Sequence, residues 1–206
     1  MKKTWLTLGA TLLLVGLYPK AASAADFYVS SIHPNRSDSH SGTSSSAPWA
    51  TGDKIKSAWG NTIQAGDTVH LEKGSSWNWS GNTFWLITTG GNSSSGPITI
   101  TGADYGSGAK PALLHTGGSQ DDHTFHITGS ASYITLRDFL IDCGSQLGFG
   151  ASGIRVAHQP QTGDISHVNI INMTIQNIGG GTWKYNCCIY YSAHNGYSVS
   201  DCLIEG

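Results

Sequence analysis

Ile134-Thr-Leu-Arg-Asp-Phe-Leu-Ile141 is the first of three similar stretches in the second half of the chain. Val168-Asn-Ile-Ile-Asn-Met-Thr-Ile175 and Tyr197-Ser-Val-Ser-Asp-Cys-Leu-Ile204 repeat its pattern. In each copy two apolar residues alternate with outward ones, an Asp or Asn follows, and two more apolar positions close the unit. The copies start at nearly even spacing, and recurrence of this kind is typical of a solenoid. The repeat therefore predicts most of the architecture.

Alternating apolar residues divide each repeat into three short strands, each of which would turn two side chains inward. Three strands per coil, with like residues stacked on like, are typical of a parallel β-helix. Successive coils would lie about 4.8 Å apart, so each side chain would pack over its counterpart. The expected inward pairs are Phe125/Ile127, Ile134/Leu136 and Phe139/Ile141 in the first coil, Ile154/Val156, Val168/Ile170 and Met173/Ile175 in the second, and Ile189/Tyr191, Tyr197/Val199 and Cys202/Ile204 in the third.

A short polar residue recurs just before the chain bends from the second strand of a coil to the third. Asp138, Asn172 and Asp201 occupy this position in the three copies. A side chain of this kind satisfies backbone groups that a bend leaves unpaired. The alternative is a pair of carboxylates for acid–base catalysis, but recurrence with the repeat favours the structural role.

The first part of the chain predicts one helix and several strands. Asp26–Ser30 is expected to be a strand, and alternation continues around Val69 and around Ile98. Residues Thr51–Trp59 are the one predicted helix, because Thr51 can cap it and Ile55 lies four positions before Trp59 on the same face. Such a helix would cover the first edge of a solenoid.

The N-terminal segment, as far as Ala24, predicts export. Lys2 and Lys3 precede an apolar run of about Leu6–Leu17, and Ala22-Ser-Ala24 is a small-residue cleavage signature. The run is short for a membrane span, so a retained anchor is the weaker alternative. We expect a secreted protein, extracellular or periplasmic, without a membrane span after signal cleavage. The single domain would comprise 25–206, with an N-terminal cap at about 26–66 and coils at about 67–206.

Composition excludes several classes of partner. Without Lys2, Lys3 and Lys20, 8 basic residues remain against 13 acidic ones, a net charge of −5. Such a chain is a poor partner for nucleic acid or an anionic membrane. Only 12% of the residues are charged and 27 are Gly, as tight turns and short strands require.

Four cysteines allow three disulfide pairings if all of them are bonded in an oxidising compartment. They are Cys143, Cys187, Cys188 and Cys202. Cys202 shares the expected register of Phe139, so a small buried hydrophobic residue is the alternative there. A metal site of Cys187, Cys188 and His194 would lack a fourth ligand and the usual paired spacing.

The chain resembles the right-handed parallel β-helix proteins of the pectate-lyase-like superfamily. The resemblance covers most of the mature chain and rests on its repeated coils and on Asp26-Phe-Tyr-Val29, Gly66-Asp-Thr-Val-His-Leu71, Gly96-Pro-Ile-Thr-Ile100 and Tyr105-Gly-Ser-Gly-Ala-Lys-Pro111. It implies an all-β fold, a right-handed parallel β-helix that forms a single-stranded solenoid of three strands per coil with an N-terminal capping helix. Members cleave acidic polysaccharides by β-elimination, hydrolyse or epimerise them, or serve as adhesive and structural solenoids.

Substrates of such proteins usually lie along an outer sheet face, so the residues between the inward pairs are candidates. On the first sheet these are His126, Arg155 and Tyr190, and Trp85 would extend the row. Aromatic rings stack on sugars, and an Arg fork binds a uronate carboxylate with two hydrogen bonds. Isolated polar residues on a solvated sheet are the alternative. The predicted substrate-binding residues are His126, Arg155, Lys184, Tyr185, Tyr190 and His194.

The residues favour β-elimination over hydrolysis without assigning a catalytic residue. Elimination needs a neutralised carboxylate, a base near the α-proton and an acid near the leaving oxygen. Arg155 or Lys184 could supply the first, and the tyrosines and histidines of the candidate set could supply the others. Polygalacturonase-like relatives carry carboxylates in a Gly-Asp-Asp-Cys type of motif. Here the matching stretches read Tyr185-Asn-Cys-Cys188 and Ala151-Ser-Gly153, without the acid and base that hydrolysis requires.

Two further expectations concern metals and chain length. Asp121-Asp-His123 is the one candidate for binding Ca²⁺, although two adjacent carboxylates make a weak signal.

The chain stops at Gly206, just after Ile204, so we expect a β-helix that is incomplete at its C-terminus, with a shortened natural product as the alternative.

The predicted function is that of a secreted, monomeric polysaccharide lyase-like protein that acts on or binds an acidic, uronate-containing polysaccharide. The alternative is a non-catalytic solenoid for glycan binding, adhesion or extracellular structure.

Overall fold

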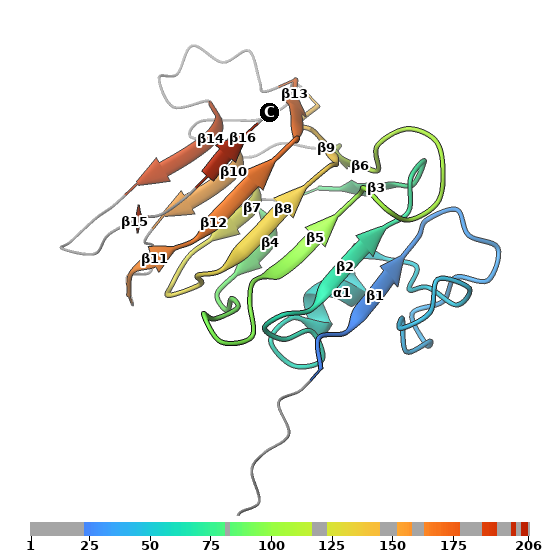
Figure 1. Ribbon diagram of the computed structural model, residues 1–206. Helices are drawn as coiled ribbons and strands as arrows, with labels where there is room; N and C mark the ends of the chain where they lie inside the picture. Colours follow the sequence, from blue (N-terminus) through green and yellow to red (C-terminus); the bar gives the residue numbers. More distant parts are fainter. Residues whose placement is uncertain are drawn as a thin grey trace, which may run out of the picture.

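The fold is all-β, with parallel sheets and one short helix, and is compatible with a parallel β-solenoid. The computed structural model describes residues 23–80, 83–116, 123–144, 152–157, 163–177, 187–192, 199–200 and 203–205. Strands stack in sequence order from β1 at one end to β14 and β16 at the other (Figure 1). Within each sheet the paired strands run parallel.

Three sheets form the faces of the molecule, and they are named here in the order used for the repeat. The first sheet contains β4 (Thr83–Ile87), β7 (His123–Ile127), β10 (Ser152–Ala157) and β14 (Cys187–Ser192). The second contains β1 (Asp26–Val29), β2 (Thr68–Leu71), β5 (Ile98–Thr101), β8 (Ile134–Arg137), β12 (Val168–Ile171) and β16 (Leu203–Glu205). The third contains β3 (Ser76–Trp79), β6 (Ala112–His115), β9 (Leu140–Asp142) and β13 (Thr174–Gln176). A further small sheet pairs β11 (Ile165–Ser166) with β15 (Val199–Ser200).

The predicted inward pairs of the first two coils lie in the interior. All of them are buried except Met173 and Ile175, which are partly buried. Phe125 is paired with Ile154, and Leu136 with Ile170, so equivalent side chains stack in columns. These four side chains are essentially inaccessible to solvent. Each contributes roughly 1.5–3 kcal/mol through removal of its apolar surface from water. The alternating pattern therefore predicted these columns correctly.

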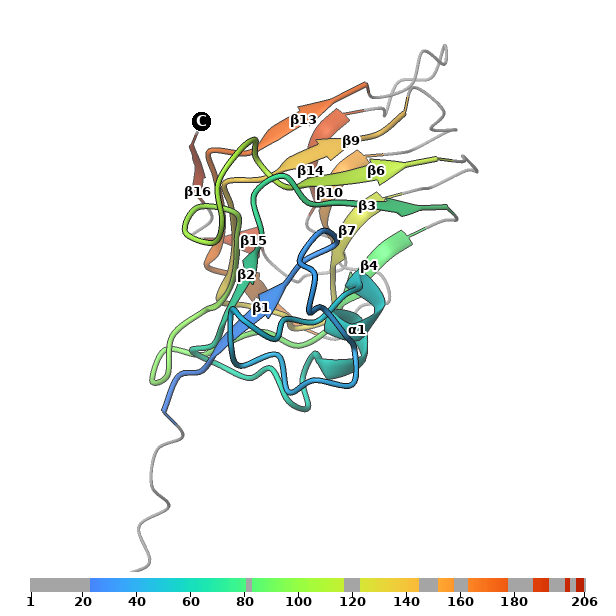
Figure 2. The same cartoon turned by 90° about the vertical axis from the view of Figure 1, so that its right-hand side faces the viewer.

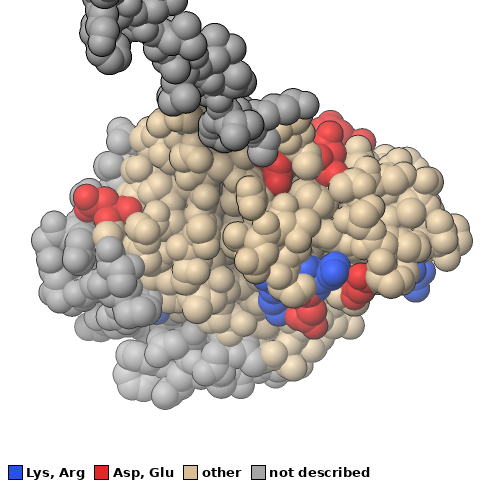
Figure 3. Space-filling view, turned by 90° about the horizontal axis from the view of Figure 1, so that it is seen from below, with Lys and Arg blue, Asp and Glu red and all other residues tan. Residues whose placement is uncertain are grey.

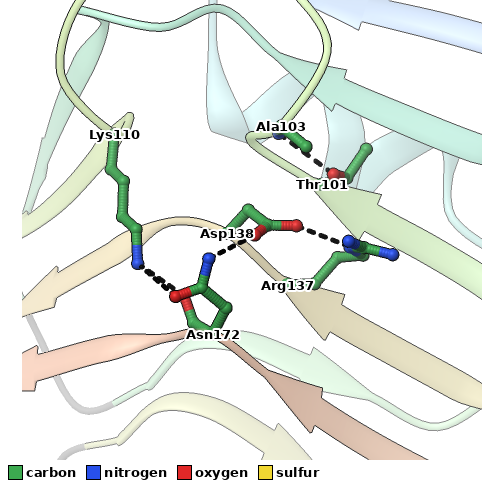
Figure 4. A network of polar contacts seen from close by, with 6 residues as sticks. All are labelled: Thr101, Ala103, Lys110, Arg137, Asp138 and Asn172. Atoms are coloured by element: carbon green, nitrogen blue, oxygen red, sulfur yellow. Dashed lines mark hydrogen bonds and ion pairs between the residues drawn. The ribbon is translucent and has the colours of Figure 1, made fainter. Parts of the chain in front are cut away.

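Polar side chains form a ladder at the bend after the second sheet, at the predicted positions 138 and 172. Their hydrogen bonds join side chains, whereas the sequence predicts bonds to backbone groups of the bend. Asp138 and Asn172 have φ of 63° and 48°, a left-handed conformation that Asp and Asn adopt more readily than most residues. Asn172 Nδ2 donates to Asp138 Oδ1 at 2.7 Å, and Lys110 Nζ donates to the Asn172 carbonyl at 2.6 Å (Figure 4). Burial alone would raise the pKa of Asp138, but hydrogen bonds from Arg137 and Asn172 leave it lowered. The pair therefore has a structural role.

The predicted register of the third coil is wrong beyond its first strand. Val199 pairs with Ile165 in the small sheet, and Ile204 pairs with Ile170 in the second sheet. Tyr197, Asp201 and Cys202, the other residues on which this prediction rests, lie outside the described residues. Leu136, Ile170 and Ile204 follow one another at intervals of 34 residues (170−136 and 204−170). The third copy of the sequence pattern starts only 29 residues after the second (197−168), so aligning the copies assigns its residues to the wrong strand.

Helix α1 (Gly52–Ala58) confirms the predicted helix and its cap. Thr51 Oγ1 accepts a hydrogen bond from the Lys54 amide at 3.2 Å. The helix lies beside β4, the edge strand of the first sheet (Figure 2). A Cβ at Gly52 would stand 2.7 Å from Phe84 Cζ, so only glycine allows this close contact.

The surface carries few charges, in agreement with the composition. On the face seen in Figure 3 the acidic and basic side chains form small separate groups among uncharged residues. Across the described ranges, which begin at residue 23, no helix has both the length and the apolar character needed to span a membrane.

Candidate functional site

The predicted row on the first sheet is present in register. His126 pairs with Arg155, and Arg155 pairs with Tyr190, on three consecutive strands. All three side chains are partly buried. The prediction that Trp85 extends the row is wrong, because Trp85 pairs with the inward-facing Phe125 and is only 3% exposed. Leu86 takes the place opposite His126 and is 57% exposed.

A buried histidine joins this row from the start of β7. His123 is 2% exposed, and its Nδ1 lies 3.0 Å from Ser152 Oγ on the neighbouring strand. Its Nε2 lies 3.0 Å from Arg155 Nη1. A guanidinium can only donate, so Nε2 accepts and the proton of the neutral imidazole is on Nδ1. His123 Nδ1 thus donates a hydrogen bond to Ser152 Oγ, and His123 Nε2 accepts one from Arg155 Nη1.

Both histidines of the cluster are neutral at ordinary pH. Burial, followed by the charge of Arg155 and the proximity of His126, lowers the pKa of His123 to about 3. Burial and then the Arg155 charge lower the pKa of His126 to about 4. The two rings meet edge to face with centroids 5.4 Å apart. Removing two imidazoles from water beside a guanidinium therefore suppresses their protonation.

Arg155 is the centre of the arrangement. Its guanidinium carbon lies 5.6 Å from the centre of the Tyr190 ring, within the range of a cation–π contact. Its Nε is buried and without a hydrogen-bond partner in the described part of the chain, as is Nε2 of His126. None of the ion pairs between described residues involves Arg155. A half-buried cation with an unused donor is a ready partner for an anion.

The geometry limits the chemistry that the cluster can perform. Ser152 resembles a nucleophile beside a histidine, but the His123 tautomer set by Arg155 offers Ser152 a proton instead of removing one. A general base works best when its pKa is near the operating pH. His126, with a pKa of about 4, is an acceptor for a hydroxyl hydrogen bond but a weak base for carbon. The cluster is therefore better suited to binding than to proton abstraction.

Sequence reasoning found part of this cluster and missed the rest. The sequence pattern indicates His123 only as part of the Ca²⁺ candidate and gives no site role to Ser152. The available signal was their spacing, which equals the spacing of Phe125 and Ile154 on the same two strands. The remaining predicted residues lie outside the described part of the chain: Lys184, Tyr185 and His194 of the binding set, and Asp121 and Asp122 of the Ca²⁺ candidate.

Metal and cysteine chemistry can be assessed only over the described ranges. There, no group of three or more His, Cys, Asp or Glu side chains is arranged to hold a metal ion. Cys143 and Cys188 are free thiols, so the pattern with all four cysteines bonded is not present. Burial raises the pKa of Cys143 to about 12, which keeps this thiol protonated and unreactive.

No protein-family model matches this chain, and no curated protein matches its sequence.

Proposed function

We propose that this chain is an exported, right-handed parallel β-helix of the pectate-lyase-like type that binds an acidic polysaccharide across the strands of its first sheet. The observation that carries the proposal is the position of Arg155 between His126 and Tyr190, with its Nε unpaired among the described residues. A partly desolvated cation that has no carboxylate partner among the described residues favours an anionic ligand.

The spacing of the row supports a polymer that crosses the strands. Neighbouring parallel strands lie about 4.8 Å apart, which is close to the length of one pyranose unit. One sugar would therefore correspond to each strand. Tyr190 would stack on one ring, Arg155 would bind the carboxylate of the next, and Nε2 of His126 would contact a hydroxyl of the third.

Among reactions, β-elimination is the one that these residues favour. Arg155 would neutralise the uronate carboxylate and so make the α-proton more acidic. Tyr190 is the side chain of the row that could give or take a proton next to it. Carboxylates suited to hydrolysis are absent from β7, β10 and β14 among the described positions.

A second candidate is a non-catalytic solenoid that binds acidic glycans. The specific observation in its favour is the lowered pKa of both histidines, which makes them weak bases while leaving them able to form hydrogen bonds. In this case the first sheet would bind the same ligand without changing it.

One experiment with two readouts separates these functions. The mature protein, starting at Ala25, is incubated with pectate, alginate and chondroitin, and a neutral glucan serves as the control. Absorbance from unsaturated products reports elimination, and calorimetry reports binding. A lyase gives both signals with one of the acidic polymers, and a binding solenoid gives heat without absorbance. Failure to bind any acidic polymer, or equal binding of the glucan, would overturn the proposal.

A further inference from the structure

A cavity lies beside β4, the edge strand of the first sheet. It has a volume of about 440 Å³, is open to solvent on one side, and is bordered by α1 together with β3 and β4. We call it the helix pocket. Its lining includes Asp53 and Lys56 from the helix, Asn78 and Trp79 from β3, and Phe84 from β4. It contains none of the residues of the histidine cluster and is a separate site.

Aromatic rings form the walls of the helix pocket. Trp79 and Phe84 are each 7% exposed, and their ring centroids are 5.6 Å apart. Phe84 packs so closely on Gly52 that a Cβ there would stand 2.7 Å from Phe84 Cζ, and Trp77 Nε1 donates to the Ala50 carbonyl at 3.0 Å. The walls are therefore fixed before any ligand arrives, which lowers the entropy lost on binding.

Backbone polar groups of β3 face the helix pocket along the edge of the strand that pairs with no other described strand. In a parallel sheet, alternate residues direct their backbone groups to opposite neighbours. The carbonyls of Ser75 and Trp79 accept from Ala112 and Thr116 on the β6 side. The N–H and C=O of Asn78 therefore point away from β6, toward the edge that the helix pocket borders.

Two side chains add to this set of polar groups. The Asn78 side chain is exposed, and Nε1 of Trp79 is buried with no partner within the described ranges. The pocket thus combines two aromatic rings with an accessible lining that is mostly polar.

Charge distinguishes this pocket from the first-sheet row. Lys56 Nζ lies 2.8 Å from Asp53 Oδ1 and 4.3 Å from the centre of the Phe84 ring, so its charge is already compensated. The pocket offers no free cation comparable to Arg155 among its described lining residues. An anionic ligand would gain little here, whereas aromatic walls and neutral hydrogen-bonding groups suit an uncharged polyhydroxylated molecule.

We infer that the helix pocket binds a single neutral monosaccharide unit. Its volume is near the lower end of the roughly 300–1,000 Å³ range of ligand pockets, which fits one sugar ring better than an oligosaccharide. The inference does not depend on the proposed function of the first sheet, because the two sites share no residue.

Saturation-transfer NMR on the mature protein tests this inference. The probes are the methyl glycosides of glucose, galactose and mannose, with glucuronate as the charged comparison. We expect transfer to at least one neutral glycoside. Asn78→Ala and Trp79→Phe should each weaken its binding about fivefold, the effect of one neutral hydrogen bond. Asn78→Ala changes an exposed side chain and leaves the fold intact, so it remains informative if Trp79→Phe does not fold.

Arg155→Ala is the matched control, since it alters the other site only. Transfer to the neutral glycoside should be the same in this variant as in the unmodified protein. The inference is overturned if no neutral glycoside receives saturation, if Asn78→Ala binds like the unmodified protein, or if Arg155→Ala abolishes the transfer. Preference for glucuronate over the neutral glycosides would also overturn it.

Discussion

The first and second sheets have the same strand geometry but differ in what they present to the outside. On the second sheet, Thr99, Thr135 and Asn169 occupy equivalent positions on consecutive strands. Asn169 Nδ2 donates to Thr135 Oγ1 at 3.4 Å, so these side chains contact one another. On the first sheet the equivalent row is His126, Arg155 and Tyr190, with two buried polar atoms that have no partner in the described structure.

This difference shows that the repeat alone does not mark a functional site. Both rows recur with the coils, and both follow from the same alternation. Only the row on the first sheet has buried polar atoms, Arg155 Nε and His126 Nε2, without a hydrogen-bond partner among the described residues. Burying a polar atom without a partner costs free energy, so folded proteins usually avoid it. Between these two rows, the unpaired polar atoms are what distinguishes the row that we propose as a binding site.

The largest expected effect concerns the interior that supports both sheets. Phe125 is fully buried and packs against Trp85 and Phe139, with ring centroids 5.1 and 5.8 Å away. Phe125→Ala should lower the free energy of unfolding by about 3–5 kcal/mol because it leaves a cavity. Leu86→Ala, at an exposed position of the same sheet, should change it by less than about 0.5 kcal/mol. Urea denaturation measures both, and similar losses would contradict the assignment of inward and outward faces.

Next in size is the effect of Arg155 on ligand binding, which tests the comparison between the sheets directly. Arg155→Ala should weaken binding of the acidic polysaccharide roughly ten- to a hundredfold, because a charge-assisted hydrogen bond is lost. Asn169→Ala makes the matching change on the second sheet of the same coil and should leave binding unchanged. Isothermal calorimetry measures both variants. Equal effects of the two substitutions would show that the first sheet has no special role.

Acid should destabilise the first sheet through its histidines. The unfolded state binds a proton near pH 6.5, whereas folded His123 does so only at about 3. Between these values the unfolded state carries more protons, so the free energy of unfolding falls as the pH falls, by at most about 1.4 kcal/mol per pH unit. Above about pH 6.5 His123 contributes no pH dependence.

Two measurements check this pH dependence. Urea denaturation of His123→Gln should show a shallower decline of stability in acid than the unmodified protein. NMR of the unmodified protein gives an independent answer, because the His123 ring signals should not titrate above about pH 4 if the pKa is lowered as described. A titration near pH 6.5 would contradict the burial and the contact with Arg155.

The parts of the fold that depend on local pattern could be predicted from the sequence. Thr51 caps α1, and most inward pairs of the first two coils are buried as expected. The sequence pattern does not predict strands β3 and β6. Their inward positions include Trp77, Trp79 and His115, so aliphatic residues do not alternate with polar ones there. Large rings and a buried histidine can replace aliphatic side chains only when the tertiary structure supplies partners, which the sequence does not show.

The register of the third coil and half of the site could not be predicted for a related reason. Period-two strands resemble one another, so a shifted alignment matched Val199 to the wrong column. At the site, alternation lapses at the start of β7 and β10, where His123, Thr124 and Phe125 are buried in succession. The contact between His123 and Arg155 follows from that local departure and has no signature in the alternating pattern.

The smallest effect is expected at the bend after the second sheet and would sharpen the view that this side of the molecule is structural. Asn172→Gly keeps the left-handed backbone and removes the side-chain bonds to Asp138 and Lys110. Asn172→Ala removes the same bonds and adds the strain of a Cβ at positive φ. Alanine should therefore be the less stable variant by about 1 kcal/mol, as measured by urea denaturation. Both variants should bind the acidic polysaccharide as well as the unmodified protein does, and weaker binding in either would mean that the bend contributes to the ligand site as well as to the coil.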